Sequence, residues 1–203
     1  MENVKIDGVA SFKGGEYGIL TIDGKATCSG NISAETMNVD GIFKCSGEIQ
    51  AGLLICDGVA RVNGNVKAKK IIIDGILKID GGNKLVAEEI DCDGLIKIDG
   101  EISADIIKID GFIEAGEITG DSVFIRSPKS FFLSLFKSKR SKIRLIEATN
   151  VEIQGLRAQE VNGKDIRIEC GCIIDSVDCS GTLWISPKAE VKNLSGNFTR
   201  IDS

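Results

Sequence analysis

The sequence predicts an all-β protein folded as a single-stranded parallel β-helix, a solenoid of triangular cross-section with rungs of about 17 residues. Three observations lead to this prediction. An Asp-Gly pair recurs at nearly constant intervals, apolar residues occupy fixed columns between the pairs, and their two-residue period slips once per repeat. Glycine occurs 24 times and proline only twice in 203 residues, which fits many tight turns in a regular architecture.

The Asp-Gly pairs set the length of the repeat. They begin at Asp7, Asp23, Asp40, Asp57, Asp74, Asp93 and Asp110, in steps of 16, 17, 17, 17, 19 and 17 residues. A second pair follows six residues later in the middle repeats, at Ser29-Gly30, Ser46-Gly47, Asn63-Gly64, Asp80-Gly81 and Asp99-Gly100. The step of 19 contains the stretch "GGNK" (81–84), which we interpret as a two-residue insertion at a turn.

The apolar columns define the sides of the coil. Within a repeat they stand two residues apart, as in Phe43 and Cys45, which is the period of a strand. A repeat with an odd number of residues cannot alternate throughout, and the phase slips at pairs such as Glu35-Thr36. Two glycine corners and one slip give three bends per rung. Glycine suits such corners because it allows positive φ or a close approach of the backbone. An ordinary β-sandwich is the alternative, but it gives no reason for fixed columns.

The pattern loosens after Gly111 but continues in stretches such as "DIRIECG" and "SGTLWIS". From Ile143 onward we expect two to three less regular rungs. The predicted organisation is a regular coil over residues 1–126, a corner insertion over 127–142, and C-terminal rungs of the same coil with a polar tail over 143–203.

The repeat pattern of Asp-Gly pairs and apolar columns resembles that of the bactofilins, a family of bacterial polymer-forming cytoskeletal proteins. The best match is "VDGIFKCSGEIQAGLLICDGVARVNGNVKAKKIIIDG" (39–75), and the Gly-x-Ile/Val-x-Ala piece recurs as "GNISA", "GEIQA", "GNVKA" and "GEISA". The resemblance implies a right-handed β-helix that polymerises end to end without nucleotide, often on a membrane. Family members can carry an N-terminal membrane-targeting peptide, whereas here Val4 and Ile6 already stand in core columns, which argues against such an anchor.

Composition limits the cellular locations and the classes of partner that can be expected. The chain has no histidine, the commonest general base and metal ligand, and its net charge of −5 argues against a nucleic-acid partner. Seven cysteines without a secretory signal, and the lack of an apolar run near the ~20 residues of a membrane span, favour a reducing, cytoplasmic location.

The Asp column and the cysteines are the candidate chemical groups. Spaced carboxylates could bind calcium, although Asp before Gly is favoured in turns for its own sake. A column of cations (Lys44, Arg61, Lys78 and Lys97) stands four residues after each Asp and is expected to relieve carboxylate repulsion. Four cysteines fall in core columns (Cys28, Cys45, Cys56 and Cys92), where a thiol acts as a small apolar group.

Two further cysteines, Cys170 and Cys172, are predicted on one face of a strand, with Cys179 not far on. They could suggest zinc, but the usual finger spacing and a histidine are missing. β-Helical enzymes use a catalytic histidine or paired acids on long loops, and no acid lies between Ser122 and Ile146. We therefore expect no catalytic residue, no metal and no cofactor.

Two surfaces are unusually apolar. The lateral stripe is an outward column two residues after each Asp, consisting of Ile42, Val59, Ile76, Leu95 and Phe112, and a long exposed apolar column indicates a contact surface. The insertion combines apolar and cationic residues, namely Phe131, Phe132, Leu133, Leu135, Phe136, Lys137, Lys139 and Arg140. Its flanks Arg126 and Arg144 are expected to add two further cations without counter-charges. The insertion either folds back over the coil or docks on an anionic membrane, where apolar burial and cations both contribute.

The two ends complete the prediction. A solenoid end exposes strand edges and a core cross-section, so Val4, Ile6 and Phe12 of the first rung are candidates for self-association. We expect a non-enzymatic scaffold that assembles end to end with its own copies, in the cytoplasm or peripherally on the inner membrane face, with possible protein clients. The alternative is a monomeric or dimeric β-helical module that recruits a protein partner through the lateral stripe.

Overall fold

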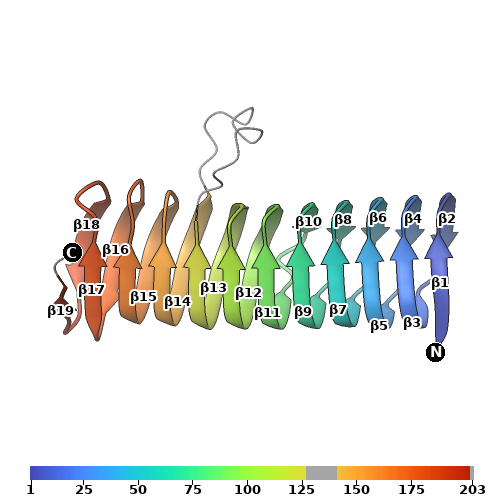
Figure 1. Cartoon of the computed structure of the whole chain (residues 1–203), viewed down its shortest axis with the longest axis horizontal. Coiled ribbons are helices and arrows are strands. Elements are labelled where there is room, and N and C mark those ends of the chain that lie inside the picture. Colours follow the sequence, from blue (N-terminus) through green and yellow to red (C-terminus); the bar gives the residue numbers. More distant parts are fainter. Residues whose placement is uncertain (127–140, 202–203) are drawn as a thin grey trace.

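The chain forms an all-β solenoid of about 11 turns in a computed structural model that describes residues 1–126 and 141–201 (Figure 1). Every strand pairing among the described residues is parallel and links one rung to the next. The rungs lie side by side in one row, with the N-terminus at one end and the C-terminus at the other. The predicted parallel β-helix is therefore confirmed.

The N-terminal rungs each combine a long strand and a short one. The first rung has β1 (Glu2–Ile6) and β2 (Val9–Phe12). The next rungs alternate eight-residue and four-residue strands: β3 (Gly15–Ile22), β4 (Lys25–Cys28), β5 (Ile32–Val39), β6 (Ile42–Cys45), β7 (Ile49–Cys56), β8 (Val59–Val62), β9 (Val66–Ile73), β10 (Ile76–Ile79) and β11 (Leu85–Cys92).

Each long strand covers two sides of the coil. In β5, Ile32 and Ala34 are buried, the pair Glu35-Thr36 is not, and Met37 and Val39 are buried again. This is the predicted phase slip, and it bends the strand. With Phe43 and Cys45 of β6 buried on the third side, a rung has three inward-facing segments, which is the triangular cross-section expected.

The core is a set of columns along the coil axis. Ile49 of β7 pairs with Ile32 of the preceding rung and with Val66 of the following rung, and all three are at most 2% exposed. The column continues to Leu85 and Ile102, so the register survives the two-residue insertion. Stacked columns leave each rung in contact only with its neighbours, which is the arrangement of a solenoid.

The Asp-Gly corners require glycine for space and not for a left-handed backbone. A Cβ placed on Gly41 would stand 2.0 Å from the carbonyl oxygen of Gly24, and the next corners repeat this contact. These glycines have no positive φ, so of the two reasons anticipated, only close approach applies. Positive φ occurs at Gly81 (83°) and Gly82 (69°), which form the turn of the insertion, and Gly100 packs over Gly82 and Asn83.

The later rungs are shorter, and from β12 to β15 each rung is one merged strand. The elements are β12 (Leu95–Ile109), β13 (Phe112–Ile125), β14 (Lys142–Ile153), β15 (Arg157–Ile168), β16 (Ile173–Cys179), β17 (Thr182–Ile185), β18 (Glu190–Ser195) and β19 (Thr199–Arg200). Ile146 pairs with Val161 and Val161 with Val177, which are steps of 15 and 16 residues. The register shift between Ile98 and Glu101 marks where one corner residue is lost.

The coil continues across the predicted insertion. β14 pairs with β13 from Lys142 to Ile153, so Lys142 already belongs to the coil. The Ser141 hydroxyl accepts a hydrogen bond from the amide of Ile113 at 3.1 Å. Four layers follow β13 (β14, β15, β16 and β18), so the expectation of two to three was too low. Degenerate spacing in this region concealed the extra rung.

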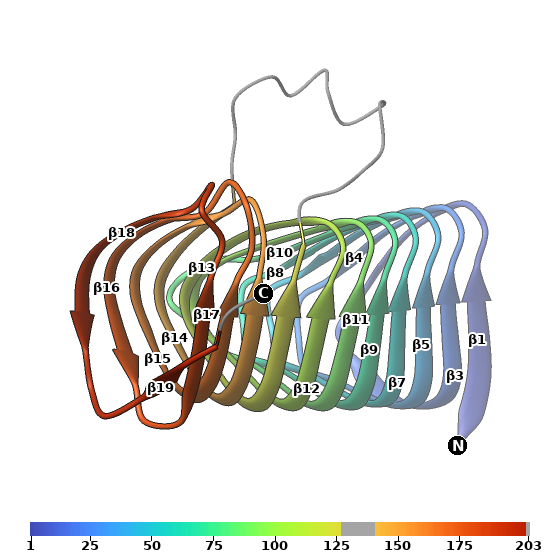
Figure 2. The same cartoon turned by 60° about the vertical axis from the view of Figure 1, so that its left-hand side comes forward.

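The coil is right-handed. In Figure 1 the strands nearest the viewer point upward while the chain advances from right to left, and the turned view in Figure 2 shows the same course. Column spacing is the same in either hand, so the sequence indicated handedness only through the family resemblance.

Candidate functional site

The predicted lateral stripe is one straight column in the structure. Ile42 pairs with Val59, Val59 with Ile76, Ile76 with Leu95, and Leu95 with Phe112, each on the outward side of its strand. Ile42 is 47% exposed and Ile76 is 40% exposed, while the other three are half-buried. The short strands β2 to β10 that include the first part of this column follow one another in a row along the coil (Figure 1). The stripe is therefore a continuous apolar ridge on one side of the coil.

A column of acids runs along the corner before the stripe. Desolvation, followed by the neighbouring carboxylates of Asp23 and Asp57, raises the pKa of Asp40. Desolvation and the carboxylates of Asp74, Asp91 and Asp110 raise the pKa of Asp93 in the same way. The described residues contain no group of three potential ligands placed to hold a metal ion. The acids behave as a ladder of like charges.

The cation column does not neutralise these corner acids, contrary to expectation. Lys78 bonds Asp80 at 3.3 Å, beyond the far end of its strand, and Lys97 bonds Glu114 at 2.5 Å, its partner in the next rung. Four residues along an extended strand span roughly 13 Å, which is beyond the reach of a lysine side chain. Among the residues that the structure describes, a lysine bonds the corner acids only at the first rungs, where Lys5 bonds Asp23 at 2.8 Å and lowers its pKa.

The first rung has a partly uncovered core. Val4, Ile6 and Phe12 pack against the core cluster but are only partly buried. Their partners in the next rung, Leu20, Ile22 and Cys28, are all 0% exposed. The difference is one layer of covering side chains, so this end of the coil presents an apolar cross-section.

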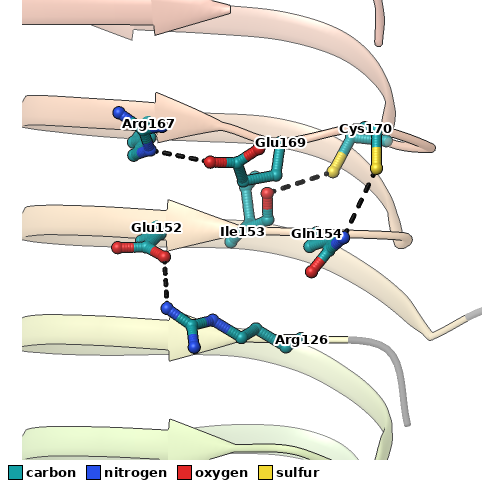
Figure 3. Close-up of polar contacts among 8 residues, drawn as sticks. Arg126, Glu152, Ile153, Gln154, Arg167, Glu169 and Cys170 are labelled. Atoms are coloured by element: carbon teal, nitrogen blue, oxygen red, sulfur yellow. Dashed lines mark hydrogen bonds and ion pairs between the residues drawn. The ribbon is translucent and has the colours of Figure 1, made fainter. Parts of the chain in front are cut away.

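The predicted membrane-contact residues lie outside the described residues: Phe131, Phe132, Leu133, Leu135, Phe136, Lys137, Lys139 and Arg140. The flanking residues are described, and they correct one expectation. Arg126 donates to Glu152 at 2.6 Å (Figure 3), and Arg144 bonds Glu117. Both flanking cations therefore have counter-charges, supplied by neighbouring rungs that no local sequence window contains.

The cysteines of the core columns are buried as predicted. Cys28, Cys45, Cys56 and Cys92 are at most 3% exposed, and none forms a disulfide. Burial raises the pKa of the thiols of Cys45 and Cys56 to about 11, and that of Cys92 to about 12. These groups are neutral packing elements.

The Cys-x-Cys pair was expected on one face of a strand, and this was wrong. Cys170 lies in a turn with Gly171, whose φ is 78°, and Cys172 leads into β16. Gln154 donates from Nε2 to Cys170 Sγ at 3.3 Å, and Cys172 Sγ donates to the Ile153 carbonyl at 3.4 Å (Figure 3). The two thiols thus bond to the preceding rung.

A surface hollow of about 590 Å³ lies on the C-terminal rungs. Its two acids are Asp175 and Glu190, which stand among Lys142, Arg157 and Lys192. Asp175 bonds Lys192 at 2.6 Å. Asp175 is thus an ion-pair partner in a hollow of mixed charge.

Sequence reasoning missed a second set of exposed apolar residues. Ile19 is 41% exposed and Ile106 is 39% exposed, and both lie on the same outward column of the long strands. That column is interrupted by Lys70 and Glu89, which bond each other at 3.1 Å. Because its apolar residues are not consecutive, the repeat alignment gave no signal.

No family model, no curated protein and no solved structure matches the chain. Among the described residues, no helix is long and apolar enough to cross a membrane.

Proposed function

We propose that this chain is a non-enzymatic, bactofilin-like structural protein that assembles end to end into a cytoskeletal polymer or scaffold. One observation supports the proposal above all. Val4, Ile6 and Phe12 of the first rung are partly exposed, although the same columns are fully buried one rung later. A further rung supplied by a second copy would bury them, because a solenoid core grows by adding layers.

The strand edges support the same contact. The amide of Asp23 donates to the carbonyl of Ile6 at 3.0 Å, and Lys25 donates to Gly8 at 2.8 Å, so the first rung is bonded on its inner side. Its outer side offers the other half of a β-ladder to a second copy. Hydrogen bonding along this edge would give the polymer direction and regular spacing.

The test places a charge in the end contact. We expect Ile6→Lys to reduce the protein to monomers in sedimentation velocity and to remove filaments in negative-stain images, because a buried unpaired ammonium is costly. Ser11→Lys is the matched control, since Ser11 is exposed and points outward in the same rung. Monomeric parent protein at every concentration, or equal loss of assembly in both variants, contradicts the proposal.

A second variant probes the same end without adding charge. A Cβ at Gly24 would point at Gly8 in the preceding rung, whereas a Cβ at Gly8 meets nothing within 4 Å. Gly8→Ala therefore adds a methyl group on the side where a further rung would stack. We expect weaker assembly without a loss of stability in dilute protein.

We also propose a cytoplasmic protein attached peripherally to the inner membrane face through the apolar and basic residues of the insertion. Apolar burial and cations near anionic lipid contribute weakly per copy, and many copies on one polymer make the attachment firm. The variant Phe131→Ser/Phe132→Ser/Phe136→Ser should assemble normally but no longer sediment with anionic vesicles. If the variant sediments with vesicles as well as the parent does, or if the parent does not bind them, the proposed membrane attachment is wrong.

The second candidate is a β-helical binding module that recruits a protein client through the lateral stripe. The observation that favours it is the unbroken, partly exposed apolar column from Ile42 to Phe112. Sedimentation distinguishes the two, because a recruiting module stays monomeric or dimeric at concentrations where a polymer grows.

A further inference from the structure

Three parallel columns run along the short-strand side of the coil. The acid column precedes the lateral stripe by two residues and the cation column follows it by two. The acid column contains Asp40, Asp57, Asp74, Asp93 and Asp110, and the cation column contains Lys44, Arg61, Lys78 and Lys97. Pairing of β6 with β8, β8 with β10, and β10 with β12 keeps each column in register. Neighbouring columns are roughly 6.6 Å apart, and successive rungs about 4.8 Å apart.

The charges that flank the stripe are incompletely neutralised within the chain. In the part of the chain that the structure describes, Lys44 and Arg61 have no ion-pair partner, although Lys78 and Lys97 do. On the other side, desolvation and then the neighbouring like charges raise the pKa of Asp40 and so disfavour its ionised form. A surface with exposed apolar residues between unpaired opposite charges suits a partner with the reverse order.

A second copy of the same chain has that reverse order when it is turned about an axis parallel to the coil. We propose that two coils pair side by side through this face, parallel and in register. The rotation exchanges the two flanking columns, so Lys44 of one copy meets Asp40 of the other, and Arg61 meets Asp57. Each stripe residue meets its own counterpart across the two-fold axis.

The same charges disfavour the antiparallel alternative. A two-fold axis perpendicular to the coil reverses its direction but leaves the columns on their own sides. Acids would then face acids at every rung, and cations would face cations at all rungs except the outermost, where Lys44 would meet Glu114. The order of the columns therefore selects the parallel pair, which neither the apolar stripe nor the cations would do alone.

The contact is small. Five half-buried or exposed apolar residues and their flanking charges are far fewer than the 20–30 residues per side of a standard interface. The paired state is therefore weak for isolated coils, and covalent trapping is the suitable measurement. This inference goes beyond end-to-end assembly and does not depend on it, so it is tested in the assembly-deficient Ile6→Lys background.

Single cysteines at the two ends of the stripe report the orientation. Ile42→Cys and Phe112→Cys are each combined with Cys170→Ser, which removes the partly exposed native thiol. In a parallel pair, each variant alone forms a disulfide-linked dimer under mild oxidation. In a mixture in which one variant carries a mass tag, Ile42→Cys should not link to Phe112→Cys.

Three outcomes overturn the proposal. Preferential linking of Ile42→Cys to Phe112→Cys shows an antiparallel pair. No dimer above the level of an exposed control, Thr27→Cys in the rung before the stripe, shows that no pair forms. Protection of both cysteines from a maleimide at low protein concentration shows that another part of the same chain covers the stripe.

Charge reversal tests whether the flanking charges select the parallel pair. Lys44→Glu/Arg61→Glu makes both flanks acidic, and Asp40→Lys/Asp57→Lys makes both cationic. Combined with Ile42→Cys, each should cross-link about tenfold more slowly than the parent face, because four ion pairs per dimer become repulsive. An equimolar mixture of the two should regain cross-linking between unlike chains. Equal rates for all combinations would show that charge does not select the pair.

Discussion

Replacing one corner glycine by alanine should destabilise the coil, and the structure gives the size of the effect. In Gly58→Ala the new Cβ would lie 2.1 Å from the Gly41 oxygen and 2.4 Å from the Asp40 oxygen, both backbone atoms of the preceding rung. It must recede by roughly 1.4 Å to reach an ordinary contact of about 3.5 Å. Opening the corner by that amount breaks the bonds from Gly58 to Val39 and from Val59 to Gly41, each 2.8 Å long.

Two lost hydrogen bonds, with their groups left beside a packed core, cost about 3 kcal/mol in the free energy of unfolding. With an m-value of about 2 kcal/mol/M, the urea midpoint measured by far-UV circular dichroism should fall by about 1.5 M. Gly8→Ala is the matched control because it changes the same Asp-Gly corner in the first rung, where a Cβ meets nothing within 4 Å. It should be neutral, or stabilising by up to about 1 kcal/mol through the unfolded state. Equal midpoints for the two variants would refute the close-approach explanation.

Ile49→Lys, at a position 2% exposed between Ile32 and Val66, should cost more than about 4 kcal/mol in urea unfolding, whereas Gln50→Lys on the outward face should change stability by less than about 0.5 kcal/mol. Cys45, Cys56 and Cys92, with thiol pKa values raised to about 11, about 11 and about 12 by burial, should resist a thiol reagent at pH 8 until urea unfolds the protein, and fast native labelling would show that their columns face outward. Asp40 and Asp23 should give opposite pH effects in dilute protein. The pKa of folded Asp40 is raised, so its contribution to stability grows as pH falls through that pKa, and Asp40→Asn should stabilise the protein at pH 7 but not at low pH. The pKa of folded Asp23 is lowered by Lys5, so its contribution to stability is present above the unfolded pKa and is lost on acidification. Asp23→Asn should therefore destabilise the protein at pH 7. The same sign for both substitutions at pH 7 would contradict the ladder of like charges.

The fold was predictable because its determinants are local and repeated. A core column such as Ile32, Ile49 and Val66 is visible in the sequence once the repeat is aligned, and the pairing follows from it. The rung count after β13 was not predictable in the same way. There the corners lose residues, as between Ala115 and Glu117, and the steps fall to 15 and 16.

The candidate surfaces were predictable only in part. The stripe was found because its residues keep a fixed distance from the Asp-Gly corner in five consecutive repeats. The ion pairs could not be predicted from the sequence, because they join residues of neighbouring rungs. Arg126 reaches Glu152, 26 residues away, and no sequence pattern sets that partner. The placement of Cys170 and Cys172 on one face of a strand was wrong for a related reason: Gly171, with positive φ, forms a turn where the sequence suggested a strand.

The two proposed contacts act along perpendicular directions, and the parallel orientation makes them cooperate. A lateral pair in parallel register places both N-terminal rungs at the same level, so Val4, Ile6 and Phe12 of two copies form one broader end. A second pair that stacks on this end makes two contacts at once, and its effective affinity rises far above that of a single coil. An antiparallel pair would separate the two N-terminal ends by the full length of the coil and lose this gain.

With parallel pairing, single coils would associate weakly in either direction, while paired coils would extend readily. Assembly should accordingly show a concentration threshold in the parent protein, and Lys44→Glu/Arg61→Glu should raise that threshold while leaving the first rung and its stability unchanged. An unchanged threshold in this variant would show that end-to-end growth proceeds without the lateral face.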